Sequence, residues 1–227
     1  MIGIFDSGDG GLLALKEIRR RLPSADIAFF ADRSNAPYGT KTKSELIRLV
    51  KNSVERLVGA GAAKILMACC TASTIYSDLP QEYREITLPI ISPTALAAAN
   101  ATKSGRVAVI ATEATVASHA FANALYAHKS VRRVIEHPVQ PLVSLIEGGC
   151  VDGRISEAQK QELSRLLAPI KGQKADTLVL GCTHFPLLSI AIEGLLPGVH
   201  LVSSAREGAL EMIKYAEVKG KSKTLYL

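Results

Sequence analysis

The stretch ILMACCT at residues 65–71 decides the fold, because a similar stretch, LVLGCT, occurs again at residues 178–183. Each stretch consists of a short apolar run, a small residue, cysteine and threonine. Apolar runs of this length without alternation are typical of parallel strands that are buried on both faces. The repetition therefore predicts two similar halves, each with a buried strand that ends at a cysteine.

A second pair of stretches supports this division: IGIFDS at residues 2–7 is similar to VAVIAT at residues 107–112. Along the whole chain, short apolar runs alternate with amphipathic stretches of helical period. The expected strands cover residues 2–5, 27–31, 64–68, 90–92, 107–111, 131–135, 177–181 and 199–202, and the clearest expected helices cover residues 11–21, 44–59, 115–127 and 156–170.

This alternation predicts an α/β fold with mainly parallel sheets. We expect two pseudosymmetric α/β domains, with a functional site in the cleft between them. The first domain should comprise residues 1–92 and 205–227, and the second residues 93–204, with the last helix packed back on the first domain.

The composition excludes several classes of protein. The chain has 227 residues, of which 48% are hydrophobic and 21% charged, which suits a globular core. It contains no apolar run near the roughly 20 residues of a membrane helix, and its N-terminus does not resemble a signal peptide. We therefore expect a cytoplasmic protein with no membrane partner. The net charge is +6, but the basic residues are dispersed and no aromatic residues interleave with them, so we expect no nucleic-acid partner.

The four cysteines are Cys69, Cys70, Cys150 and Cys182. They form no CxxC pair, and adjacent cysteines with a Cys-x-His step do not match the spacing of structural zinc sites, so we expect no metal. In a cytoplasmic protein the thiols should be free. Cys150 is interpreted as a small core residue without an assigned role.

Polar residues follow the expected strands, where ligands bind in open α/β sheets. Cys69 and Cys182 each end such a strand. Two thiols on either side of a carbon atom can remove a proton from one face and return one to the other. Asp6 and His184 are placed to help each thiol exchange its proton, and Glu147 could assist on the His184 side.

The glycines of SGDGG at residues 7–11 predict a tight turn and a helix N-terminus that can hold an anion. Their spacing is not the dinucleotide fingerprint, and no P-loop lysine follows. We therefore expect neither NAD nor ATP.

Six motifs in order resemble the aspartate/glutamate racemase superfamily, and glutamate racemase within it. They are IFDSGDGG at 4–11, Asp32 with PYGTK at 37–41, ACCTAS at 68–73, ATEATVAS at 111–118, PLVSLIEG at 141–148 and GCTHFP at 181–186.

The resemblance implies two pseudosymmetric α/β domains and interconversion of L- and D-glutamate without a cofactor. It also implies that D-glutamate supplies peptidoglycan, and that a homodimer can form. By position, Cys69 and Cys182 would be the two acid/base groups, assisted by Asp6, His184 and Glu147. The implied substrate-binding residues are Asp6, Ser7, Tyr38, Gly39, Cys70, Thr71, Thr183 and His184, with further carboxylate contacts from Thr112 and Thr115.

One position departs from the family pattern, which has asparagine where this chain has Cys70. A thiol is a much weaker hydrogen-bonding group than an amide. Three alternatives therefore stay open beside the racemisation of glutamate. The chain could act on aspartate or another amino acid, it could bind glutamate without turnover, or it could be a thiol-redox or metal protein.

Overall fold

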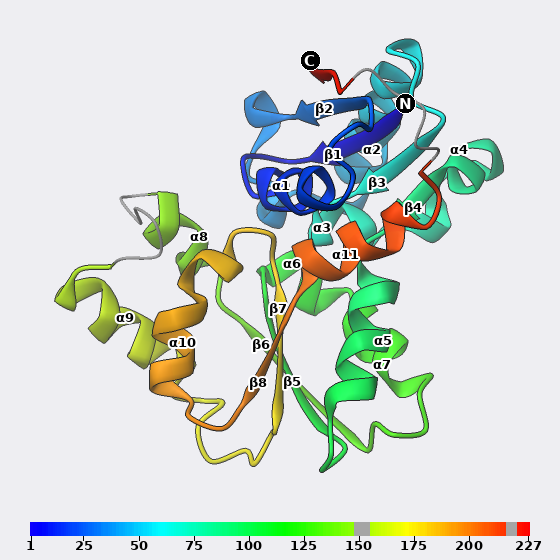
Figure 1. Cartoon of the computed structure of the whole chain (residues 1–227). Coiled ribbons are helices and arrows are strands. Elements are labelled where there is room, and N and C mark those ends of the chain that lie inside the picture. Colours follow the sequence, from blue (N-terminus) through cyan, green and yellow to red (C-terminus); the bar gives the residue numbers. More distant parts are fainter. Residues whose placement is uncertain (148–154, 217–221) are drawn as a thin grey trace.

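The computed structural model describes residues 1–147, 155–216 and 222–227. These residues form two sheets, each made of parallel strands (Figure 1). The first sheet has the strand order β4-β3-β1-β2-β9, and the second has the order β6-β5-β7-β8. The strands of the first sheet are β1 (Ile2–Asp6), β2 (Ile27–Ala31), β3 (Lys64–Met67), β4 (Thr87–Pro89) and β9 (Thr224–Tyr226). Those of the second are β5 (Arg106–Ala111), β6 (Arg133–Pro138), β7 (Thr177–Gly181) and β8 (His200–Ser203).

The two sheets share one topology. In the first sheet β1 lies between β3 and β2, with β4 beyond β3; in the second sheet β5 lies between β7 and β6, with β8 beyond β7. Strands β1 to β4 therefore correspond one by one to β5 to β8. The cysteines that follow β3 and β7 stand at equivalent positions of the two halves, as the repeated stretches predicted.

Helices cover both sheets. They are α1 (Gly11–Arg21), α2 (Lys43–Gly59), α3 (Cys70–Ser73), α4 (Gln81–Ile86), α5 (Ile91–Ala101), α6 (Glu113–Ala117), α7 (Ala120–Tyr126), α8 (Pro141–Glu147), α9 (Glu157–Leu167), α10 (Ser189–Leu195) and α11 (Ser204–Ile213). Single 3₁₀ turns are η1 (Arg33–Asn35), η2 (Tyr38–Thr40), η3 (Tyr76–Asp78) and η4 (Phe185–Leu188). None of the helices in these described ranges is long and apolar enough to cross a membrane.

Helix α2 shows why the sequence forms these elements. Thr42 accepts a hydrogen bond from the Glu45 amide, and the Glu45 carboxylate accepts one from the Thr42 amide, which closes a capping box. Its buried residues recur at helical spacing: Leu46, Leu49, Val50, Ser53, Val54 and Leu57. This stripe packs against Phe5 and Ile65 on one face of the first sheet.

The halves are joined by a shared core. One cluster of buried side chains contains Ile4 and Phe29 of the first sheet together with Val109 and Val179 of the second. Helix α11 follows β8 and packs against both α1 and α5 (Figure 1). The last helix thus contacts both halves. The domain boundaries at 92/93 and 204/205 stay predictions.

Two expected elements were wrong. Residues 90–92 are not a strand: β4 ends at Pro89 and α5 begins at Ile91, because the apolar residues here are buried at a helix start. The helix expected over residues 115–127 is two helices, α6 and α7. The chain breaks between them at His119, which has a left-handed φ of 53°.

Candidate active site

The carboxyl ends of the central strands meet at one cavity of about 270 Å³, near the lower end of the range for small-ligand sites. Ser7 follows β1, Cys69 follows β3, Thr112 follows β5 and Cys182 follows β7. The lining residues are Ser7, Gly8, Ala36, Pro37, Tyr38, Gly39, Cys69, Cys70, Thr71, Thr112, Gln140, Val143, Ser144, Cys182, Thr183 and His184. Both halves therefore contribute to a single site.

Cys69 lies in the wall contributed by the first half. Its Sγ is 3.3 Å from the Ser7 hydroxyl and accepts a hydrogen bond from the Ala72 amide at 3.5 Å, so it caps the short helix α3. Burial raises the pKa of this thiol to about 11, and the negative charge of Asp6 acts in the same direction. Cys69 is therefore a protonated thiol at neutral pH.

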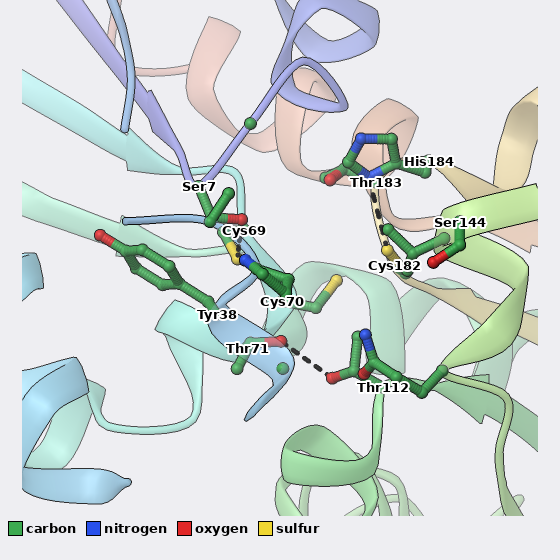
Figure 2. Close-up of a pocket in the computed structure, with 16 residues that line it drawn as sticks. Ser7, Tyr38, Cys69, Cys70, Thr71, Thr112, Ser144, Cys182, Thr183 and His184 are labelled. Atoms are coloured by element: carbon green, nitrogen blue, oxygen red, sulfur yellow. Dashed lines mark hydrogen bonds between the residues drawn. The ribbon is translucent and has the colours of Figure 1, made fainter. Parts of the chain in front are cut away.

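Cys182 lies in the wall contributed by the second half, and Figure 2 shows the two sulfurs on opposite sides of the pocket. Its Sγ lies 3.7 Å from Nδ1 of His184. Burial raises the pKa of Cys182 well above the ordinary value, so this thiol is also neutral at pH 7. His184 is the group placed to exchange a proton with it.

Asp6 is fully buried and lies behind the cavity wall. Its Oδ2 accepts hydrogen bonds from the amides of Gly8 and Gly11, both at 3.1 Å, and its Oδ1 accepts one from the Thr183 hydroxyl at 3.3 Å. Burial raises the pKa of this carboxyl, while the nearby His184 lowers it. Asp6 thus ties the glycine-rich turn of the first half to the loop after β7.

Tyr38 is held by a carboxylate that sequence reasoning left without a role. Its hydroxyl donates to Oδ2 of Asp32 at 2.7 Å, and Asp32 also accepts hydrogen bonds from Asn35 and Ser34. Burial and the hydrogen bond to Asp32 raise the pKa of Tyr38. The pair fixes the turn that carries Gly39 to the cavity.

Three threonine hydroxyls form a closed triangle below the cavity. Thr71 Oγ1 lies 2.9 Å from that of Thr112 and 3.1 Å from that of Thr115, and the last two are 2.8 Å apart. Thr71 and Thr112 line the cavity (Figure 2), whereas Thr115 supports them. The triangle joins α3 of the first half to α6 of the second.

Most residues predicted from the sequence meet here. Ser7, Tyr38, Gly39, Cys69, Cys70, Thr71, Thr112, Cys182, Thr183 and His184 all line the cavity. Cys70 is buried and its thiol is neutral, because burial raises its pKa well above the ordinary value. The side chain of Glu147 and all of Cys150 lie outside the described residues, so their predicted roles are untested.

Sequence reasoning assigned no substrate contact to six lining residues: Gly8, Ala36, Pro37, Gln140, Val143 and Ser144. Gly8, Pro37, Val143 and Ser144 lie within motifs that were recognised, and Ala36 and Gln140 directly precede two of them, which is the signal that could have found them. The described lining side chains include no Lys, Arg, Asp or Glu. Within the described ranges, no three His, Cys, Asp or Glu side chains are grouped so as to hold a metal ion.

The comparison with known families decides the relationship. A family model described as Asp/Glu/Hydantoin racemase matches residues 16–212. The chain belongs to this racemase family. This match confirms the resemblance seen in the motifs. The chain is therefore an isomerase, which is the enzyme class expected from the sequence.

Members of the racemase family match almost the whole chain. Glutamate racemase of Gloeobacter violaceus is 42% identical over 200 residues, which is 87% of this chain and 73% of the relative. A glutamate racemase isoform of Bacillus anthracis superposes with a TM-score of 0.90 at 31% identity, covering 100% of this chain and 86% of that one. The Francisella tularensis glutamate racemase solved with D-glutamate has a TM-score of 0.87 at 30% identity, covering 99% and 86%. These matches confirm the predicted two-sheet α/β fold.

Proposed function

We propose that the protein interconverts L- and D-glutamate by moving the Cα proton between Cys69 and Cys182. The observation that carries the proposal is the placement of the two thiols. They follow equivalent strands, β3 and β7, and lie on opposite walls of one cavity. Such a pair can reach both faces of a carbon bound between them.

In the proposed reaction, the thiolate of one cysteine takes the Cα proton, and the electron pair left behind is delocalised into the α-carboxylate. The thiol of the other cysteine then gives its proton to the opposite face. The negative charge has moved from one sulfur to the other, and the reverse reaction starts from that state. The mechanism needs no bound cofactor, because the two thiols supply both the base and the acid.

The thiols need help to ionise, since burial raises the pKa of both. His184, with Nδ1 at 3.7 Å, takes the proton of Cys182, and the Ser7 hydroxyl, at 3.3 Å, donates a hydrogen bond to the thiolate of Cys69. Asp6 assists by holding Thr183 and the glycine-rich turn in place. Glu147 is proposed to assist His184.

Substrate recognition is proposed to use neutral donors. Hydroxyls of Ser7, Thr71, Thr112 and Thr183, together with the turn that carries Tyr38 and Gly39, surround the cavity. These groups can satisfy the carboxylates of glutamate without a bound cation. We also propose that the enzyme is cytoplasmic, forms a homodimer and supplies D-glutamate for the synthesis of peptidoglycan.

The test is incubation with L-glutamate in D₂O, followed by optical rotation and deuterium at Cα. Loss of rotation with deuterium uptake is expected. Both Cys69→Ser and Cys182→Ser should abolish racemisation, whereas the matched thiol variant Cys150→Ser should keep it. Full activity in either of the first two variants would exclude the two-thiol mechanism.

Cys70 gives a specific reason for a second candidate substrate. This thiol lines the cavity where the family pattern has asparagine, so one strong hydrogen-bonding group is absent from the wall. A lost hydrogen bond to a charged group costs about ten- to a hundredfold in affinity. Exchange with L-aspartate but not with L-glutamate would show a changed substrate, and binding of glutamate without exchange would show a non-catalytic relative.

A further inference from the structure

Gln140 carries an unexplained polar atom at the cavity. It lies between β6 and α8 and lines the cavity from the second half. Its Oε1 is buried and has no hydrogen-bond partner among the described residues. The only other such side-chain atom in the described ranges is Oε1 of Glu136, which does not line the cavity. Because buried polar atoms are almost always paired in folded proteins, the missing partner of Gln140 needs a reason.

The position of Gln140 points to the substrate. A Cβ atom added to Gly39 would lie 2.4 Å from Gln140 Oε1 and 2.9 Å from Thr112 Cβ. The amide therefore fills the space that the missing side chain of Gly39 leaves, and crosses from the second half to the first. Gly39 and Thr112 are themselves residues expected to contact the substrate.

The chemistry of the wall identifies the missing partner. The described lining residues include hydroxyls, thiols, an imidazole and one side-chain amide, that of Gln140, but no carboxylate. An amide oxygen can only accept a hydrogen bond. The two carboxylates of glutamate are acceptors as well, so they cannot satisfy it. The ammonium group is the strong donor that an α-amino acid brings into the cavity.

We propose that Gln140 is a specificity residue that accepts a hydrogen bond from the α-ammonium group of the bound amino acid. This inference rests on the proposed function and deepens it. The side chain turns from Gly39 toward the ligand, and the ammonium group supplies the donor that no described residue supplies to its oxygen. Gln140 then selects α-amino acids against diacids that lack the amino group.

The test compares two ligands that differ only by this group, L-glutamate and glutarate, in the wild type and in Gln140→Leu. The variant should raise both KM for L-glutamate and its dissociation constant, measured by calorimetry, by about ten- to a hundredfold. Its kcat should change by less than about threefold. Competitive inhibition by glutarate should change by less than about twofold. The difference between the two ligands isolates the contact with the ammonium group.

Gln140→Glu keeps an acceptor but adds a negative charge, so it should weaken the binding of glutarate, which has no ammonium group, more than that of L-glutamate. A loss for L-glutamate as large as that for glutarate in this variant would mean that the side chain at position 140 does not meet the ammonium group, and would overturn the proposal. Equal losses for L-glutamate and glutarate in Gln140→Leu, or no loss for either, would also overturn it. The exposed Gln81 provides the control Gln81→Leu, which should leave both ligands unaffected.

Failure of the proposed function would give a different result from failure of the proposed role of Gln140. In that case the wild type shows no Cα exchange, whereas the comparison of ligands by calorimetry still reports on Gln140. Circular dichroism and thermal unfolding of each variant exclude a folding defect as the cause of weaker binding.

Discussion

Replacement of Gly10 by alanine would test how closely the two halves meet behind the cavity. The new Cβ would lie 2.3 Å from Thr183 Oγ1, 2.7 Å from Thr183 Cβ and 2.9 Å from His184 Nδ1. Gly10 has φ −57° and ψ −32°, which alanine adopts freely, so the substitution adds a steric conflict without backbone strain. Normal contacts are about 3.5 Å, so Thr183 and His184 must move by about 1 Å.

This displacement would act on the chemistry through Cys182, whose sulfur contacts His184, and through the hydrogen bond from Thr183 to Asp6. A shift of about 1 Å in a catalytic group costs about 100-fold in rate. Overpacking should also lower the free energy of unfolding by about 1–3 kcal/mol. The assays are kcat/KM for Cα exchange and urea unfolding.

The matched control is Gly194→Ala in helix α10, where an added Cβ meets nothing within 4 Å. This variant should keep full activity and gain up to about 1 kcal/mol of stability from helix propensity. Gly10→Ala with activity within about threefold of the wild type and unchanged unfolding would refute the contact geometry.

Three further predictions concern stability. Tyr38→Phe removes the donor to Asp32 and should lower the free energy of urea unfolding by about 1–3 kcal/mol; a change near zero would contradict the buried hydrogen bond. Burial raises the pKa of Cys69 from 9.0 to about 11, so the folded state keeps its proton where the unfolded state loses it. The protonated Cys69 thiol contributes fully to the free energy of unfolding below pH 9. This contribution falls by roughly 3 kcal/mol as the pH rises to 11. Between these two pH values the free energy of unfolding of Cys69→Ser should therefore fall less than that of the wild type. Equal pH profiles for the two proteins would contradict this prediction. Burial opposes ionisation of Asp176, but hydrogen bonds from Thr102, Ser104 and Lys103 outweigh it and lower its pKa. Asp176→Asn should lower the thermal unfolding temperature at pH 7, with a difference from the wild type that shrinks as the pH falls below 4; a constant difference would argue against a charged carboxylate.

Much of the site could be predicted because its residues directly follow strands. Cys69 and Cys182 end equivalent apolar runs, and parallel strands bring their carboxyl ends to one edge of a sheet. Gln140 escaped prediction since its role depends on packing against Gly39, about 100 positions earlier in the chain. Its place directly before the motif at 141–148 was a signal, but no local pattern reports the contact with Gly39.

The two errors in the predicted elements also arise from features that the local sequence pattern does not report. Ile90 and Ile91 are apolar because they are buried beneath other elements, and burial alone does not distinguish a strand from a helix start. The break at His119 arises from a left-handed residue, which periodicity does not detect. Asp6 was expected to assist the thiols; its carboxylate is held by the amides of Gly8 and Gly11, and its charge raises the pKa of Cys69 and Cys182.

The return of the chain to its first half has a consequence for synthesis. Helix α1 packs against α11, and β2 pairs with β9, so elements made first are completed by elements made last. While the ribosome extends the second sheet, α1 can pack against β1, but the part of α1 that contacts α11 stays uncovered. Domains normally fold in the order in which they emerge. Because α11 ends at Ile213 and β9 at Tyr226, this molecule instead completes the native contacts of α1 and β2 only after translation has passed residue 226.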